Sequence, residues 1–132
     1  MEISVKTKKH IEAIDITKEI EKATEQLWDN EKKMGNNKKS GVCLIFCPHT
    51  TCGILINEPD AVSDIIEAID EIEPKLDYQH KGNAQAHIKA SLISPSLLVT
   101  INQGKLELGQ WQKIFLAEFD GPRTRQIKVS IL

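Results

Sequence analysis

Three of the four histidines lie among other polar residues, where an imidazole could carry chemistry. His49 follows the apolar run VCLIFC in the motif CPHTTCG, His80 lies in LDYQHKGN, and His87 comes seven residues later. Three neutral imidazoles with an open position are the ligand set of a catalytic zinc-type site, where the metal polarises an oxygen or activates bound water. Spacing alone does not bring them together, so three separate, hydrogen-bonded histidines are the alternative.

Other residues of CPHTTCG could bind an anion. Thr50 and Thr51 precede a glycine and offer hydroxyl and backbone donors at a turn, which suits a phosphate or carboxylate oxygen. Capping of the turn is the alternative. Cys47, His49 and Cys52 form a rival thiolate set, but their spacing differs from that of the common zinc knuckles.

Arg125 is a further candidate because of its place in the run TRQIKVSIL. It alternates in phase with the apolar residues of this predicted strand, so a permanently charged guanidinium falls on the apolar face and needs an anionic partner. Glu118 could pair with it and close one end of a sheet. Alternatively, Arg125 binds an anionic ligand at the mouth of a pocket.

The segments that must position these residues show apolar residues at helical spacing in some places and at the alternating spacing of strands in others. This predicts an α+β fold in a single domain, residues 1–132. VCLIFC is a continuous apolar run, which predicts a strand covered on both faces. The two N-terminal strands are expected to form a hairpin, and the C-terminal third a meander. The predicted strands are 2–7, 10–14, VCLIFC, ILIN, SLLVTI, KLEL, WQKIFLAEF and TRQIKVSIL, and the predicted helices are 17–33, 59–73 and 83–92.

Composition excludes several classes of partner. Seventeen basic and nineteen acidic residues leave a formal charge of −2, so no overall field attracts nucleic acid or an anionic membrane. The chain has no apolar run of the ~18 residues that span a bilayer and no signal-peptide block at its start, which predicts a cytoplasmic protein. Three cysteines agree with a reducing compartment, since an odd number cannot form a closed set of disulfides.

Taken in order, several segments resemble the YjbQ family, the secondary thiamine-phosphate synthase family. The matching segments are DIT at 15–17, HTTCGILINEPD at 49–60, YQHKGNAQAHIKASL at 78–92, LELGQWQKIFLAEFDGPR at 106–123, and Arg125. The resemblance implies two β-sheets packed as a sandwich with flanking helices, assembled as a homotrimer. Cys52 departs from the pattern, because alanine is usual at its position.

The resemblance also implies a site. His49, His80 and His87 would gather around a divalent metal ion, for which three imidazoles favour Zn²⁺ or a similar metal, while diphosphate chemistry usually employs Mg²⁺. The polar positions that match the family pattern are Thr50, Asn57, Glu58, Asn83, Gln112 and Arg125.

The implied reaction joins an aminopyrimidine methyl diphosphate to a thiazole phosphate and releases pyrophosphate. In this hypothesis the three histidines hold the metal, Arg125 and Thr50 contact phosphate, and Glu58 orients a nucleophile or water. The other substrate-binding candidates are Thr51, Asn57, Asn83 and Gln112. Two alternatives stay open: a metal-dependent hydrolase of small phosphorylated metabolites, and a non-catalytic trimeric module that binds a metal or metabolite.

Overall fold

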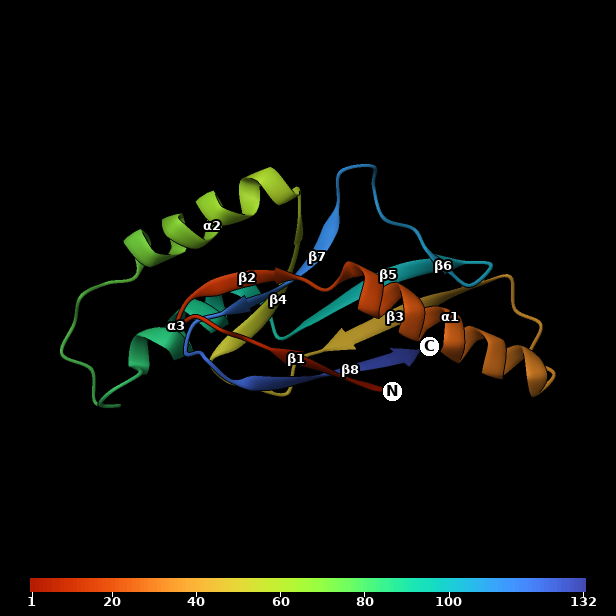
Figure 1. The fold of residues 1–132 in the computed structure, drawn as a ribbon, viewed down its shortest axis with the longest axis horizontal. Helices are drawn as coiled ribbons and strands as arrows, with labels where there is room; N and C mark the ends of the chain where they lie inside the picture. Colours follow the sequence, from red (N-terminus) through yellow and green to blue (C-terminus); the bar gives the residue numbers. More distant parts are fainter.

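A computed structural model describes residues 1–132, which form two antiparallel sheets and three helices (Figure 1). The predicted α+β fold with two sheets and flanking helices is confirmed. The elements are β1 (Glu2–Lys6), β2 (Glu12–Asp15), α1 (Thr17–Lys33), β3 (Ser40–Phe46), β4 (Cys52–Asn57), α2 (Pro59–Ile72), α3 (Ala84–Ile93), β5 (Ser96–Asn102), β6 (Lys105–Leu106), β7 (Lys113–Glu118) and β8 (Thr124–Ile131).

The strands are shared between sheet A, in the order β1-β8-β3-β5-β6, and sheet B, in the order β2-β7-β4. The predicted N-terminal hairpin and C-terminal meander are therefore wrong. β1 pairs with β8 while β2 pairs with β7, and the chain between β7 and β8 also crosses from one sheet to the other. Alternating residues identify a strand and its buried face, but they do not identify its neighbour.

Sheet A, α1 and sheet B enclose the larger core. Ile20, Ala23 and Trp28 of α1 pack with the inward residues of sheet A, such as Ile45, and with those of sheet B, such as Ile54. Asp15 stabilises the start of this helix, because its carboxylate accepts hydrogen bonds from the backbone N–H and the hydroxyl of Thr17 at 2.9 and 2.6 Å. α1 is thus fixed at its start, next to the end of β2.

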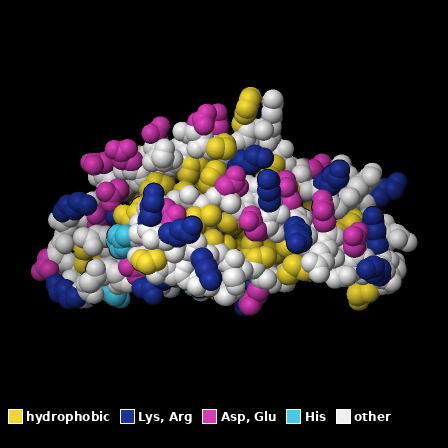
Figure 2. Space-filling view, viewed as in Figure 1, with side chains coloured by type: hydrophobic (Ala, Val, Ile, Leu, Met, Phe, Trp, Pro, Cys, Tyr) yellow, Lys and Arg dark blue, Asp and Glu magenta, His cyan; other side chains and the backbone are white.

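Sheet B is buried on both faces. On β7, Ile114 and Leu116 face the larger core, whereas Phe115 and Phe119 face a second core beneath α2 and α3. The exposed side of α2 is lined with acidic side chains (Figure 2). None of the three helices is long and apolar enough to cross a membrane.

The outer face of sheet A carries no helix, which corrects the expectation that VCLIFC is covered on both sides. Cys43 and Ile45 of β3 point inward and are fully buried. Phe46 points the other way and is 38% exposed, and Leu98 of the neighbouring strand is 65% exposed. An apolar stripe therefore remains open on this face of the chain.

The close approach of α3 to β4 depends on Gly53. A Cβ at this position would lie 2.9 Å from both the Ile93 Cγ2 and the Ser94 carbonyl oxygen, closer than such atoms normally come. The Ile54 N–H also donates to the Ser94 carbonyl at 2.8 Å. These contacts hold the end of α3 against β4, so the start of α3 reaches the loop between β3 and β4.

Candidate functional site

A polar pocket of about 330 Å³ opens where three segments meet: the β3–β4 loop, the first turn of α3, and the chain that leads from β7 into β8. No hydrophobic side chain lines it. Its lining residues are Pro48, His49, Thr50, Thr51, Asn83, His87, Asp120, Arg123 and Arg125. Six residues of the predicted site therefore do lie together: His49, Thr50, Thr51, Asn83, His87 and Arg125.

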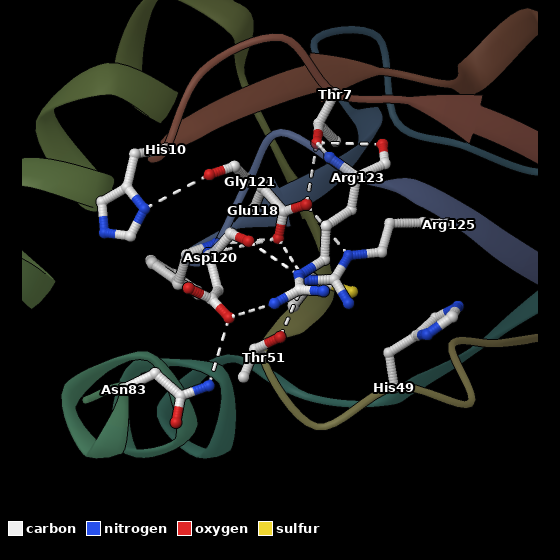
Figure 3. A network of polar contacts seen from close by, with 12 residues as sticks. Thr7, His10, His49, Thr51, Asn83, Glu118, Asp120, Gly121, Arg123 and Arg125 are labelled. Atoms are coloured by element: carbon white, nitrogen blue, oxygen red, sulfur yellow. Dashed lines mark hydrogen bonds and ion pairs between the residues drawn. The ribbon is translucent and has the colours of Figure 1, made fainter. Parts of the chain in front are cut away.

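Arg125 lines this pocket and is paired with Glu118 (Figure 3). The guanidinium donates through Nε to Glu118 Oε1 at 2.9 Å and through Nη2 to Oε2 at 2.5 Å. Nη2 also donates to Thr51 Oγ1 at 2.8 Å. The two charged side chains are only 5% and 0% exposed, so the predicted ion pair is confirmed.

Both partners stay charged despite their burial. Burial acts to raise the pKa of Glu118, but hydrogen bonds from Arg125 and from the Thr7 hydroxyl, at 2.8 Å, outweigh it and lower this pKa overall. Burial likewise acts to lower the pKa of Arg125, but the hydrogen bonds to Glu118 and the neighbouring charges together outweigh it and raise this pKa overall. A bidentate pair with a third donor is the arrangement that can hold a charge pair inside a protein.

His49 is held by the backbone of β8. His49 Nε2 lies within hydrogen-bond distance of both backbone groups of Gln126, 2.9 Å from the N–H and 3.1 Å from the carbonyl oxygen. Burial, followed by the charge of Arg125, lowers the pKa of His49. The ring is therefore neutral at pH 7 and keeps one N–H donor.

Asp120 and Arg123 complete the pocket and were missed from the sequence. Asp120 Oδ2 accepts from Asn83 Nδ2 at 3.1 Å and from Arg123 Nη2 at 2.8 Å, which joins the start of α3 to the β7–β8 connection. The hydrogen bond from Arg123 is the main cause of the lowered pKa of Asp120. Both residues flank the Gly-Pro turn in DGPR, and opposite charges across that turn were the available signal.

The predicted three-histidine metal centre is not formed. His87 lines the pocket, and His80 packs against it with ring centroids 4.8 Å apart, but His80 is not part of the lining. His49 Nε2 lies against the backbone N–H and carbonyl of Gln126 in β8. The structure contains no group of three or more His, Cys, Asp or Glu side chains that could hold a metal ion.

Three other predicted site residues lie at the opposite end of sheet B. Asn57 ends β4, Glu58 follows it, and Gln112 lies beside Lys113, which pairs with Asn57. Thr51 lies at the other end of β4, and the strand between is roughly 16 Å long at the usual rise per residue. Asn57, Glu58 and Gln112 therefore cannot touch a ligand in the pocket of their own chain.

A larger pocket of about 390 Å³ lies between α2 and β2, where Figure 2 shows hydrophobic side chains beneath the helix. Its lining includes Ile11, Val62, Ile66 and Phe115, with Lys9 and Glu12 at the rim. Glu12 accepts hydrogen bonds from the Lys8 and Lys9 N–H groups and so stabilises the turn into β2. Few polar groups line this pocket, whereas charged and hydrogen-bonding side chains line most of the smaller polar pocket.

A family model described as UPF0047 protein YjbQ-like matches residues 1–132. The chain belongs to the YjbQ family. The Bacillus subtilis UPF0047 protein YugU is 40% identical, over 98% of this chain and 96% of its own length. A UPF0047 protein of Archaeoglobus fulgidus is 39% identical over the full length of both chains.

Solved structures of YjbQ proteins share the whole fold. A Clostridium acetobutylicum member superposes with a TM-score of 0.84 at 44% identity, covering 100% of this chain and 99% of that one. A Sulfolobus solfataricus protein superposes with a TM-score of 0.85 at 36% identity, covering 99% and 94%. The first is described as uncharacterized and the second as of unknown function.

The predicted thiamine-phosphate synthase activity is wrong on these grounds. The YjbQ relatives carry a family designation or are described as of unknown function, and nothing in their descriptions points to this reaction. The metal on which the predicted mechanism relied also has no assembled ligand set in the chain. Family membership predicted the fold, and the pocket is the feature of the chain that bears on function.

Proposed function

We propose that the protein binds a small molecule through a phosphate or carboxylate group in the polar pocket. The observation that carries this proposal is that both arginines line one pocket without hydrophobic lining. Each guanidinium keeps N–H donors that no protein group accepts. Such donors favour a bidentate oxyanion over a neutral ligand.

The donor count of Arg125 supports the proposal. A guanidinium has five N–H donors, and Arg125 uses those of Nε and Nη2 on Glu118 and Thr51. Its Nη1 has no hydrogen-bond partner, and it is not among the fully buried polar atoms that lack one. Nη1 is therefore reachable from the pocket, with two donors free.

Arg123 and the neighbouring uncharged groups add further donors. Arg123 donates Nε to the Asp120 carbonyl and Nη2 to its carboxylate, both at 2.8 Å, which leaves three N–H groups on a half-exposed side chain. His49 adds its second ring nitrogen, Nδ1, which has no hydrogen-bond partner in the chain, and the exposed Thr50 adds a hydroxyl. Since Glu118 and Asp120 balance the two arginine charges, recognition depends on these directed donors more than on net charge.

Calorimetry with two oxyanions tests the proposal. We expect inorganic phosphate or citrate to bind the wild type, and Arg123→Gln to weaken binding about tenfold or more, because a hydrogen bond to a charged group contributes about 1.5–3 kcal/mol. Lys105→Gln, in β6 and away from the pocket, is the matched control and should bind as the wild type does. Equal affinity of Arg123→Gln and the wild type would overturn the proposal, as would the absence of binding of both anions to the wild type.

We also propose that the chain assembles as a homotrimer, as the family resemblance implies. The open apolar stripe on sheet A, including Phe46 and Leu98, supports an interface there, since such surface in a soluble chain commonly marks a contact with another protein. Asn57, Glu58 and Gln112 could then serve the same ligand only from another copy of the chain. The roles of these three residues in binding stay predictions. The same holds for the binding of a divalent metal ion and for the assignment of the protein as an enzyme.

Light scattering tests the assembly. We expect the wild type to elute with the mass of three chains and Leu98→Glu, which places a charge in the stripe, to elute with a smaller mass. Lys105→Glu, on the short strand at the edge of the same sheet, is the control for an added acidic group. A wild type with the mass of one chain would contradict the trimer.

A further inference from the structure

Two thiols lie directly beneath the loop that forms one wall of the pocket. Cys47 Sγ and Cys52 Sγ are 3.2 Å apart, in contact and about 1.2 Å farther apart than two bonded sulfurs. Both side chains are buried, at 1% and 2% exposure, and neither is part of a disulfide.

The two thiols bracket four of the residues that line the pocket, Pro48 to Thr51. At one end the Cys47 N–H donates to the Pro95 carbonyl at 2.7 Å, and at the other Cys52 pairs with Glu118 in sheet B. Thr51 accepts from Arg125, as described above. A covalent link between the sulfurs would therefore act on both ends of a short loop that contacts the arginine.

The third cysteine provides an internal comparison. Cys43 Sγ lies 3.4 Å from the Thr24 hydroxyl, and burial raises the pKa of this thiol. By contrast, the hydrogen bond from Cys52 is the main cause of a lowered pKa for Cys47, with the Arg125 charge acting in the same direction. All three cysteines are therefore equally buried, but only Cys47 and Cys52 are in contact with a second sulfur.

We propose that Cys47 and Cys52 form a redox modification site, which closes to a disulfide when a hydroperoxide oxidises the protein. The contact between the sulfurs and their position at the two ends of one loop carry the proposal. Closure draws the loop ends together and shifts Thr50 and Thr51, so it weakens anion binding. This last consequence rests on the proposed function, whereas the disulfide itself does not.

The oxidation balances in two steps. One thiol attacks the peroxide and becomes a sulfenic acid, while the other peroxide oxygen leaves as water or, for an organic peroxide, as an alcohol. The second sulfur then attacks the sulfenic sulfur, the S–S bond forms, and the hydroxyl leaves with the remaining thiol proton as water. Two electrons pass to the peroxide in total, and a dithiol reductant returns the protein to two thiols while closing its own disulfide.

Peptide mapping of the wild type tests the modification without any variant. After treatment with hydrogen peroxide and alkylation of free thiols, we expect a Cys47–Cys52 disulfide, an alkylated Cys43, and full reversal by dithiothreitol. Three alkylated cysteines after oxidation would overturn the proposal, and so would disulfides only between chains or involving Cys43. Zinc held by the two thiols in the purified protein, detected by metal analysis, would overturn it as well.

Calorimetry with inorganic phosphate tests the consequence for the pocket. We expect oxidation to weaken phosphate binding by about fivefold or more in the wild type and in Cys43→Ala, a change in the range of typical coupling between sites. In Cys52→Ala, which removes one sulfur and keeps a small apolar residue, the same treatment should leave the affinity unchanged. Equal affinity of the mapped disulfide form and the reduced form would refute the coupling.

The two proposals fail in different ways. If the disulfide forms but phosphate and citrate bind neither redox state, the anion site is refuted and the thiol pair is supported. If phosphate binds the reduced protein but peroxide forms no Cys47–Cys52 bond, the thiol pair is refuted and the anion site stands.

Discussion

The two ends of sheet B both carry polar side chains, but only one end buries them. At the pocket end, Glu118 and Arg125 are almost completely buried and are bonded to Thr7 and Thr51. At the far end, Asn57 accepts from the N–H of the next residue. The side chains at the far end are exposed, whereas those at the pocket end are enclosed by several segments.

The difference lies in the sequence distance of the hydrogen bonds. The bond from Thr7 to Glu118 spans 111 residues, and that from Arg125 to Thr51 spans 74. Gln112, at the far end, accepts from Gly109, only three residues away. Long-range bonds to buried charges form only when the whole fold is in place, so the pocket end is coupled to global stability and the far end is not.

Glu118→Gln should show the largest effect, because it removes one charge of the buried pair and leaves Arg125 uncompensated. Breaking such a pair costs about 3–5 kcal/mol, a large share of the total stability of a domain of this size. Urea unfolding measures this change directly. Glu58→Gln, the same substitution at the exposed far end, should change stability by less than about 0.5 kcal/mol.

The comparison fails if both variants lose similar stability, or if Glu118→Gln costs less than about 1 kcal/mol. A double variant separates charge from packing. Replacing Glu118 and Arg125 together by leucine should cost less than Glu118→Gln alone, because no unpaired charge then remains buried.

Two glycines give a smaller test of the same contrast. Gly53→Ala would press a Cβ against the Ile93 side chain and the Ser94 backbone at 2.9 Å, and overpacking of this kind costs about 1–3 kcal/mol. At Gly109 the nearest atom would be the flexible Gln112 side chain at 3.2 Å, so Gly109→Ala should change the free energy of unfolding far less. Thermal unfolding of both variants measures the difference, and equal midpoints would contradict it.

The sequence indicated Arg125 and its possible partner Glu118 because the alternation of residues along a strand is a local pattern. The alternation of β7 places Glu118 in phase with Ile114 and Leu116, and that of β8 places Arg125 on the apolar side of its strand. Both side chains do face the interior. Strand periodicity therefore identified Arg125, one of the two arginines of the pocket, before any contact was known.

The remaining features depend on which elements become neighbours, and no local pattern contains that information. Asn57 and Thr50 lie seven residues apart in one motif, yet an extended strand separates them. Asp120 and Arg123 reach the pocket because the chain changes sheets between β7 and β8. The three histidines also lie on separate segments, in the β3–β4 loop, before α3 and within α3, and their spacing in the sequence does not determine how these segments are arranged.

The smallest predicted effect is a pH dependence that His49 adds at the pocket end. Its lowered pKa means that, below the ordinary value of about 6.5, the unfolded chain takes up a proton more readily than the folded one. Stability contributed by the neutral ring is therefore present above that value and falls as the pH decreases below it, with a slope of at most about 1.4 kcal/mol per pH unit. His49→Gln should flatten the loss of stability between about pH 6.5 and 5 in urea unfolding.

Thr50→Ala, in the same loop and without a titrating group, should keep the wild-type slope. Glu118 adds its own loss only at lower pH, because its lowered pKa keeps its contribution intact until the pH falls below the ordinary carboxyl range. The losses of stability caused by His49 and by Glu118 therefore occur in different pH ranges. If His49→Gln and the wild type lose stability in parallel between about pH 6.5 and 5, the imidazole is not the group that couples the pocket end to acid.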